Sequence, residues 1–187
     1  MKQKNNHHYE EKTLSTEPIF SGRVISLQVD QVQLPNGKTS TRELVKHPGA
    51  VSVIAFTKEE KIILVEQYRK PLERALVEIP AGKLEPGEEP LETAKRELEE
   101  ETGYSASEWE SLTSFYTSPG FADELVHVFV AKNLEKLPTE LTTDEDEFVD
   151  VKEWTLSEAQ AAVRDGRIQD AKTAYAVLYW ELLQKKG

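Results

Sequence analysis

Three glutamates in one short segment are the residues best suited to chemistry. Glu97, Glu100 and Glu101 stand at positions i, i+3 and i+4, which places their side chains on one flank of a helix. Carboxylates this close repel one another unless a positive charge lies between them. Mg²⁺ and Mn²⁺ prefer oxygen ligands, so the spacing indicates a divalent-metal site. An isolated E-x-x-E-E segment, however, is usually no more than a solvated acidic helix face.

The residues around the glutamates predict the helix that carries them. Pro90 suits the first helical position, and Gly103 suits the residue just beyond the last turn. A helix is therefore expected over residues 90–102, with an apolar stripe beside its acidic flank. The stripe is formed by Leu91, Ala94 and Leu98.

The wider segment from Gly82 to Tyr104 resembles the Nudix box, G-x5-E-x7-R-E-U-x-E-E-x-G-U, in which U is a bulky apolar residue. Every polar and glycine position of the box is matched. Tyr104 replaces the usual aliphatic residue at the last position, a departure that concerns packing rather than chemistry. A chance match in a chain of this length is on the order of 10⁻⁷ at average residue frequencies. The match therefore outweighs the interpretation as a solvated acidic face.

The resemblance implies a role for each box residue. Nudix boxes fold as loop, helix and loop on an α/β/α sandwich with a mixed sheet. Glu97 and Glu101 match the principal metal ligands, and Glu100 matches a residue that commonly shares a metal and serves catalysis. The backbone carbonyl before the box glycine, here that of Ala81, is a further ligand, and the implied cofactor is Mg²⁺ or Mn²⁺. The structural positions of the box are Gly82, Glu88, Arg96 and Gly103, of which Glu88 and Arg96 brace the loop against the helix by a salt bridge.

A base for the attacking water is expected outside the box, as in many Nudix enzymes. The acidic segment 144–147 resembles the loop that bears the base in ADP-ribose pyrophosphatases. Aligned on the following residues 149–151, the resemblance points to Glu145 as the base and Glu147 as a carboxylate on the metal side. A shift of one or two residues stays open, and without the box the segment is equally well interpreted as an exposed acidic turn.

A proline beyond the box indicates the substrate. Pro119 lies 15 residues after Tyr104, a distance that marks the ADP-ribose subgroup of the family. Pro119, Gly120 and Phe121 resemble the substrate loop of that subgroup. Taken alone, the segment would be interpreted as an ordinary Pro-Gly turn.

Three further residues are implied to contact the substrate. Arg69, in the segment Glu66–Arg69, matches a residue that contacts phosphates, a task that suits the two-pronged guanidinium. Glu78 matches a position that binds the adenine or a ribose. Arg42 is implied to reach the substrate of a neighbouring subunit.

The elements around the box predict an α/β protein with helices packed on a mixed sheet. Strands are expected over residues 50–57, 61–68, 75–79, 111–116, 124–131 and 148–154. Two helices follow, one from a cap at Ser157 to about Arg164, the other over about 171–183. The second is expected to pack through Ala174, Val177, Leu178 and Leu182.

The N-terminal segment predicts a separate unit. Residues 18–34 and 40–46 read as strands joined by a turn at Asn36-Gly37. They form a small antiparallel β unit, residues 1–46, ahead of a Nudix domain, residues 47–187. This unit has too few apolar residues to stand alone. The resemblance implies a homodimer in which N-terminal strands exchange and help to build the adenine pocket.

Composition excludes several classes of function. A net charge of −11 disfavours nucleic-acid binding, which needs a positive surface. No apolar run approaches the ~20 residues of a membrane span. The chain has no cysteine, which excludes disulfides and thiolate metal sites and agrees with a reducing cytoplasm. The expected partner is a small nucleoside diphosphate substrate.

The sequence therefore predicts an enzyme that hydrolyses the pyrophosphate of ADP-ribose to AMP and ribose 5-phosphate. Two alternatives stay open. The first is a pyrophosphatase for another nucleotide sugar or a dinucleotide. The second is a non-catalytic sensor that binds ADP-ribose, which the complete set of box carboxylates disfavours.

Overall fold

The computed structural model describes residues 8–138 and 148–185. The chain divides into two compact units. The first comprises Met1–Gly49 and Tyr116–Leu125, and the second comprises Ala50–Phe115 and Val126–Gly187. The first unit therefore also takes in a segment from the middle of the chain, which the sequence boundary at residues 46 and 47 did not anticipate.

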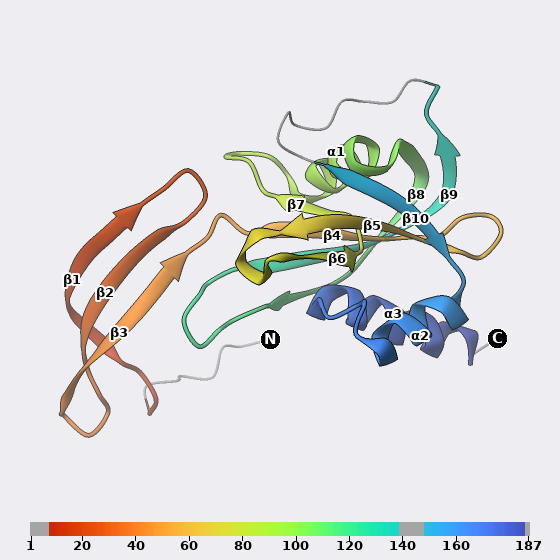
Figure 1. Ribbon diagram of the computed structural model, residues 1–187. Coiled ribbons are helices and arrows are strands. Elements are labelled where there is room, and N and C mark those ends of the chain that lie inside the picture. The colour runs from red at the N-terminus through yellow and green to blue at the C-terminus, as the bar shows by residue number, and fades with distance from the viewer. Residues whose placement is uncertain (1–7, 139–147, 186–187) are drawn as a thin grey trace. The chain divides into compact units, whose positions relative to one another are not determined.

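The first unit is built on an antiparallel sheet in the order β1-β2-β3 (Figure 1). Its strands are β1 (Lys12–Ser21), β2 (Ser26–Gln33) and β3 (Thr39–Lys46). The hairpin between β2 and β3 turns at Gly37, whose φ of 81° suits glycine. The sequence predicted one strand over 18–34, whereas a turn that begins at Gly22 divides this segment between β1 and β2. Every residue of β1 is exposed, so β1 lacks the apolar alternation that identifies a strand.

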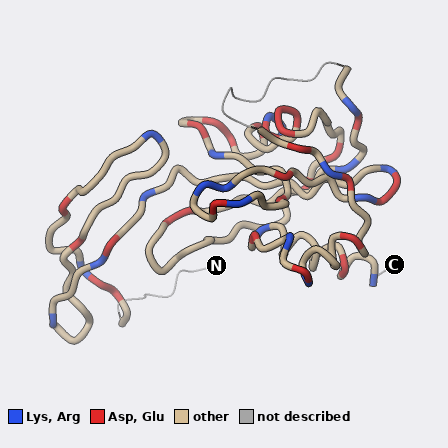
Figure 2. The backbone as a smooth tube through the Cα atoms, viewed as in Figure 1, with Lys and Arg blue, Asp and Glu red and all other residues tan. Residues whose placement is uncertain are grey.

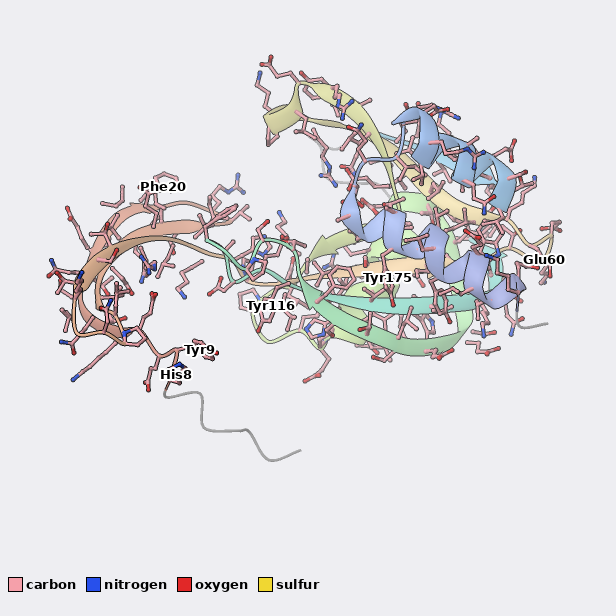
Figure 3. All side chains as sticks on the ribbon, turned by 90° about the horizontal axis from the view of Figure 1, so that it is seen from below. His8, Tyr9, Phe20, Glu60, Tyr116 and Tyr175 are labelled. Atoms are coloured by element: carbon pink, nitrogen blue, oxygen red, sulfur yellow. The ribbon has the colours of Figure 1, made fainter. Side chains whose placement is uncertain are left out.

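Few side chains of this sheet are buried. In β2 the buried residues are Asp30 and Val32, and Asp30 accepts hydrogen bonds from Thr13 and Gln28. Phe20, labelled in Figure 3, is 56% exposed. A small sheet normally needs an apolar face covered by other structure to be stable. The first unit therefore presents apolar side chains that its own strands do not cover.

The second unit is an α/β/α sandwich, as predicted from the sequence. One sheet has the order β10-β5-β6, and a mixed sheet has the order β7-β4-β9-β8, in which β4 and β9 are parallel. The strands are β4 (Ala50–Ala55), β5 (Ile62–Arg69), β6 (Arg74–Glu78), β7 (Ala81–Lys83), β8 (Tyr104–Tyr116), β9 (Leu125–Lys136) and β10 (Val149–Trp154). Helix α1 (Pro90–Thr102) lies on one side of the sheets, and α2 (Leu156–Asp165) and α3 (Ala171–Gln184) lie on the other (Figure 1).

Alternation along β4 supplies both layers of the core. Val51 and Val53 belong to the cluster that packs with Leu98 of α1, whereas Ile54 belongs to the cluster that contains Trp180 of α3. Successive side chains of a strand point to opposite faces of the sheet. Tyr175 of α3, labelled in Figure 3, packs edge-to-face against Phe115 of β8, with ring centroids 5.5 Å apart. The core thus holds α1 on the face opposite to α2 and α3.

Several elements differ from the sequence expectation. Strand β7 was not predicted, because three residues are too few to show a period. Strand β8 starts at Tyr104, whereas the sequence predicted a start near residue 111. The first half of β8 is only partly buried, so its sequence gives a weak apolar pattern. Helix α2 is capped by Thr155 rather than Ser157: the Thr155 hydroxyl accepts from the N–H of Glu158, whose carboxylate accepts from the N–H of Thr155 at 2.8 Å.

The packed face of α3 was predicted wrongly in part. The helix buries Val177 as expected, but Leu178 and Leu182 are 61% and 57% exposed. The other buried residues are Thr173, Ala176 and Trp180. The segment is apolar on nearly all sides, so its period does not select a face. The Thr173 hydroxyl, which accepts a hydrogen bond from the N–H of Ile79 at 2.9 Å, helps to set the rotation of the helix.

Within residues 8–138 and 148–185, no helix has the length and apolar character needed to cross a membrane.

Candidate metal and pyrophosphate site

Helix α1 has the ends that the sequence predicted. Pro90 occupies its first turn, and Gly103 follows its last turn with a φ of 69°. The N–H of Gly103 donates to the carbonyl of Glu99 at 2.9 Å. Acidic residues gather along this helix (Figure 2). Their side chains are arranged by two sets of contacts, one with Arg96 and one with strand β7.

Arg96 binds three carboxylates at once. Its Nη2 lies 3.2 Å from Glu88 on the preceding loop, and its Nη1 lies 2.9 Å from both Glu97 and Glu100. The salt bridge expected between Arg96 and Glu88 is therefore present. Burial by itself lowers the pKa of Arg96, but hydrogen bonds and charges from these glutamates outweigh it and raise the pKa above its ordinary value. Arg96 thus stays charged and holds the box loop against α1.

Glu97 and Glu101 reach the start of β7. The Glu101 carboxylate is buried and accepts hydrogen bonds from the N–H of Ala81 at 2.9 Å and from Gln67 Nε2 at 3.4 Å. The Glu97 carboxylate lies directly over Gly82, where an added Cβ would stand 1.9 Å from Glu97 Cδ. The glycine of the box is therefore required for the close approach of a carboxylate.

This arrangement fits a divalent cation. The carboxylates of Glu97 and Glu101 bring hard oxygen donors to the first residues of β7, and the absent side chain of Gly82 leaves room for Glu97. Within the described part of the chain, no group of three or more acidic or histidine side chains is placed to hold a metal ion. Glu145 and Glu147, the acidic residues expected to join the site, lie outside the described residues. Glu100 is engaged with Arg96.

Arg69 is held by a buried carboxylate on the adjacent strand. It ends β5, and its Nε and Nη2 donate to the two oxygens of Glu78 on β6 at 2.6 and 2.9 Å. Lys172 at the start of α3 donates to Glu78 Oε2 at 2.6 Å. Burial raises the pKa of Glu78, but the hydrogen bond from Arg69 and the charge of Lys172 outweigh it and hold the pKa at about 2. Both oxygens of Glu78 therefore accept hydrogen bonds within the protein. The expected contact of Glu78 with adenine or a ribose stays a prediction.

Sequence reasoning did not identify Lys172. It lies 94 residues after Glu78, outside every motif, and a lysine near a helix start carries no local signal of function. Only the packing of α3 against β6 brings the two residues together.

Arg69 lies close enough to helix α1 to feel the charge of its carboxylates. Its pKa is raised chiefly by the hydrogen bond to Glu78 and further by the charges of Glu78, Glu101 and Asp170. Gln67, two residues earlier on β5, bonds directly to Glu101. Strand β5 thus carries both Arg69, which pairs with Glu78, and Gln67, which bonds to Glu101.

The remaining expected substrate residues belong to the first unit. Arg42 forms a salt bridge with Glu11, with Nη2 and Oε1 2.5 Å apart. Phe121 is 56% exposed, and its carbonyl accepts from the N–H of Val45. Pro119 and Gly120 lie in the turn before it. Their contacts with substrate stay predictions.

Comparison with known proteins identifies the family of the chain. Residues 46–176 match the family model of the NUDIX domain, and residues 11–45 match that of the nucleoside diphosphate sugar hydrolase N-terminal domain. The chain belongs to the Nudix family.

Two relatives and one solved structure are similar over most of their length. The chain is 62% identical to an ADP-ribose pyrophosphatase of Bacillus subtilis (strain 168), covering 92% of this chain and 94% of that one. It is 63% identical to a methanol dehydrogenase activator of Bacillus methanolicus, covering 93% and 94%. The crystal structure of an ADP compounds hydrolase shares the fold, with a TM-score of 0.82, 23% identity and coverage of 95% and 96%.

Gly82→Ala is expected to weaken metal binding, because its Cβ would overlap the Glu97 carboxylate. Displaced supporting groups typically lower metal affinity by about 10- to 100-fold, and we expect a loss in this range. Mn²⁺ titration followed by electron paramagnetic resonance would measure it. Lys83→Ala, at the exposed next position of β7, is the control and should bind Mn²⁺ normally. Equal affinity of the two variants would contradict the geometry.

Glu78→Gln is expected to destabilise the fold in a pH-dependent way. The folded-state pKa of Glu78, about 2, lies below its ordinary value of 4.5. The ion pair therefore stabilises the protein above pH 4.5, and this contribution is lost as the pH falls towards 2. At pH 7 the free energy of unfolding should fall by on the order of 3 kcal/mol. Urea unfolding at pH 7 and pH 3 measures the difference, which should narrow at pH 3.

The matched control is Glu73→Gln, since Glu73 pairs with Lys70 at an exposed position. Exposed pairs contribute less than about 1 kcal/mol. A Glu78→Gln effect that is as small as this, or that is equal at both pH values, is incompatible with a buried ion pair.

Proposed function

We propose that this chain hydrolyses the pyrophosphate of ADP-ribose to AMP and ribose 5-phosphate. The single observation that carries the substrate is 62% identity to an ADP-ribose pyrophosphatase over 92% of the chain. The chemistry is supported by the site itself, in which Glu97 and Glu101 meet the start of β7 and Arg69 lies at the end of β5.

The proposed cofactor is Mg²⁺ or Mn²⁺, held by Glu97, Glu101 and the carbonyl of Ala81, with Glu100 as a further ligand. When bound, such a cation neutralises pyrophosphate oxygens and the charge that develops as water attacks phosphorus. Arg96 holds Glu97 and Glu100 in place. The acidic helix thus becomes compatible with an anionic substrate.

The proposed chemical step joins a water oxygen to one phosphorus and breaks the bond from that phosphorus to the bridging oxygen. Glu145 is proposed to accept the proton of the attacking water, and Glu147 is proposed as a carboxylate on the metal side. The bridging oxygen leaves with the other phosphate.

Cationic and loop residues are proposed to hold the substrate. Arg69 contacts the phosphates with a guanidinium that Glu78 holds, and Glu78 is proposed to bind the adenine or a ribose as well. Pro119, Gly120 and Phe121 form the loop that contacts the remainder of the substrate. Arg42 is proposed to reach the substrate of a second subunit.

We also propose that the chain is a homodimer assembled through the first unit. The support is the exposed apolar side chains of β1, among them Ile19 and Phe20, which are 51% and 56% exposed. A second copy would cover them and supply the apolar face that a small sheet needs. The match of residues 11–45 to a separate N-terminal family model agrees with a distinct task for this unit.

Light scattering is expected to give twice the chain mass of 21.2 kDa. The double variant Ile19→Asp, Phe20→Asp should be a monomer, because burying unpaired carboxylates in an apolar interface costs free energy. Leu178→Asp, at an exposed position of α3, is the control and should remain dimeric. Dissociation by Leu178→Asp alone would move the interface to α3.

A substrate panel tests the function. With Mg²⁺, the turnover of ADP-ribose should exceed that of GDP-mannose, NADH and diadenosine polyphosphates. Glu97→Gln, Glu101→Gln and Glu145→Gln should each lower kcat at least 100-fold, because each removes a carboxylate from the reacting centre. Product analysis should find AMP and ribose 5-phosphate.

The panel also separates the alternatives. A preference for another member would favour a different nucleotide pyrophosphatase. Binding of ADP-ribose without turnover would favour a sensor. Full activity of Glu145→Gln would place the base elsewhere in the acidic segment.

A second candidate function comes from the relative named as a methanol dehydrogenase activator, which is 63% identical over 93% of the chain. The same site would then act in the presence of a dehydrogenase. The test adds the chain, or its Glu101→Gln variant, to a methanol dehydrogenase assay. Stimulation by the unmodified chain but not by Glu101→Gln would support this function, and no stimulation by either would exclude it.

The proposed setting is the cytoplasm, where reducing conditions suit a chain without cysteine. The proposed partner is the small-molecule substrate and not nucleic acid, in keeping with a net charge of −11.

A further inference from the structure

Lys172 is a mostly buried lysine that the proposed chemistry does not use. Its side chain is 14% exposed. Its Nζ lies 2.6 Å from Glu78 Oε2 and 3.0 Å from Asp170 Oδ1. Lysine is rarely buried unless it is paired, so these two carboxylates account for its position. What remains to be explained is why Glu78 has two cationic partners.

Glu78 divides its carboxylate between Arg69 and Lys172. Arg69 donates two of its hydrogen bonds to Glu78. A guanidinium has five N–H donors, and among residues 8–138 and 148–185 Glu78 takes two of those of Arg69. The other three N–H groups can donate to a substrate. The side chain of Arg69 is 38% exposed, whereas that of Glu78 is 3% exposed. The buried carboxylate therefore holds one edge of the guanidinium and leaves the rest accessible.

Lys172 changes the net charge of the cluster around Arg69. With Lys172 in place, one carboxylate serves two cations. Without it, Glu78 would neutralise Arg69 alone and attract its guanidinium more strongly. Low surrounding polarity makes such a change in local charge more effective than it would be in water.

The position of Lys172 is set by the start of α3. Asp170 caps the helix, accepting from the N–H of Thr173 at 2.9 Å and from its hydroxyl at 2.6 Å. Thr173 in turn accepts from the N–H of Ile79, the residue after Glu78. The helix start and the end of β6 are thus linked through Asp170 and Thr173, and Lys172 pairs with the same capping carboxylate.

Arg69 faces the carboxylates proposed to bind metal. Gln67 on the same strand bonds to Glu101, and the charge of Glu101 acts on Arg69. A phosphate held by a cation at Glu101 would therefore lie within reach of an electrostatic effect from Arg69.

We propose that Lys172 is a positioning residue for the substrate pyrophosphate. It shares Glu78 with Arg69 and so leaves the guanidinium the charge and the N–H groups that bind a phosphate. This inference rests on the proposed function, in which Arg69 contacts the phosphates of ADP-ribose.

The test compares steady-state kinetics on ADP-ribose for the full chain and its variants with Mg²⁺. Lys172→Met should raise KM about tenfold with kcat within about twofold, because Lys172 acts on binding and touches no reacting atom. Lys172→Gln, which keeps a hydrogen-bond donor without the charge, should raise KM similarly. Lys172→Arg keeps the charge and should restore KM to within about threefold of the unmodified enzyme.

Two controls separate this role from a purely structural one. Lys185→Met removes an exposed lysine near the end of α3 and should leave KM unchanged. In an Arg69→Gln background, Lys172→Met should raise KM no further, because residues that act through one another are not additive. Thermal unfolding of each variant records any loss of stability separately.

The outcomes are distinguishable from failure of the proposed function. If the unmodified enzyme does not hydrolyse ADP-ribose, the proposed function fails. If it does, an unchanged KM in Lys172→Met and Lys172→Gln overturns the inference. It is likewise overturned by a fall in stability and kcat at constant KM, or by a further rise of KM in the Arg69→Gln background.

Discussion

The contact between the carboxylates of α1 and the first residues of β7 is the constraint on which the site depends. Glu97 lies over Gly82, and Glu101 accepts from the N–H of Ala81. The contact of Glu97 requires the helix and the strand to approach more closely than a side chain at Gly82 would allow. The apolar stripe of α1 supplies that approach by burying Leu98 in the core. Arg96 then fixes the outer carboxylates and the preceding loop by one guanidinium.

A second group of ion pairs holds cationic side chains in place, whereas the first holds carboxylates. In the first, one arginine holds several carboxylates, whereas in the second one buried carboxylate, Glu78, holds Arg69 and Lys172. Each device keeps like charges close together by placing an opposite charge between them. An anionic protein can in this way present both a cation site and a cationic end for an anionic substrate. Strand β5 links the two systems, because Gln67 bonds to Glu101 and Arg69 bonds to Glu78.

The two units differ in how much apolar surface they bury. The second buries a continuous core on both faces of its sheets. The first is a sheet with β1 wholly exposed, so the apolar residues of β1 add nothing to a core. This difference explains why apolar periodicity located the strands of the second unit well and divided the first unit poorly. A strand with no buried face gives no alternating pattern to detect.

The sequence by itself determined the features that depend on neighbouring residues. The ends of α1 follow from Pro90 and Gly103, its acidic flank from the spacing of three glutamates, and the family from the box between Gly82 and Tyr104. The tertiary structure alone decided the rest. It selected the buried face of an all-round apolar α3, revealed that Gly82 is needed for the approach of Glu97, and joined Glu78 to Lys172 across 94 residues. Periodicity and capping act over a few residues, whereas these choices depend on which surfaces meet when the helices pack on the sheets.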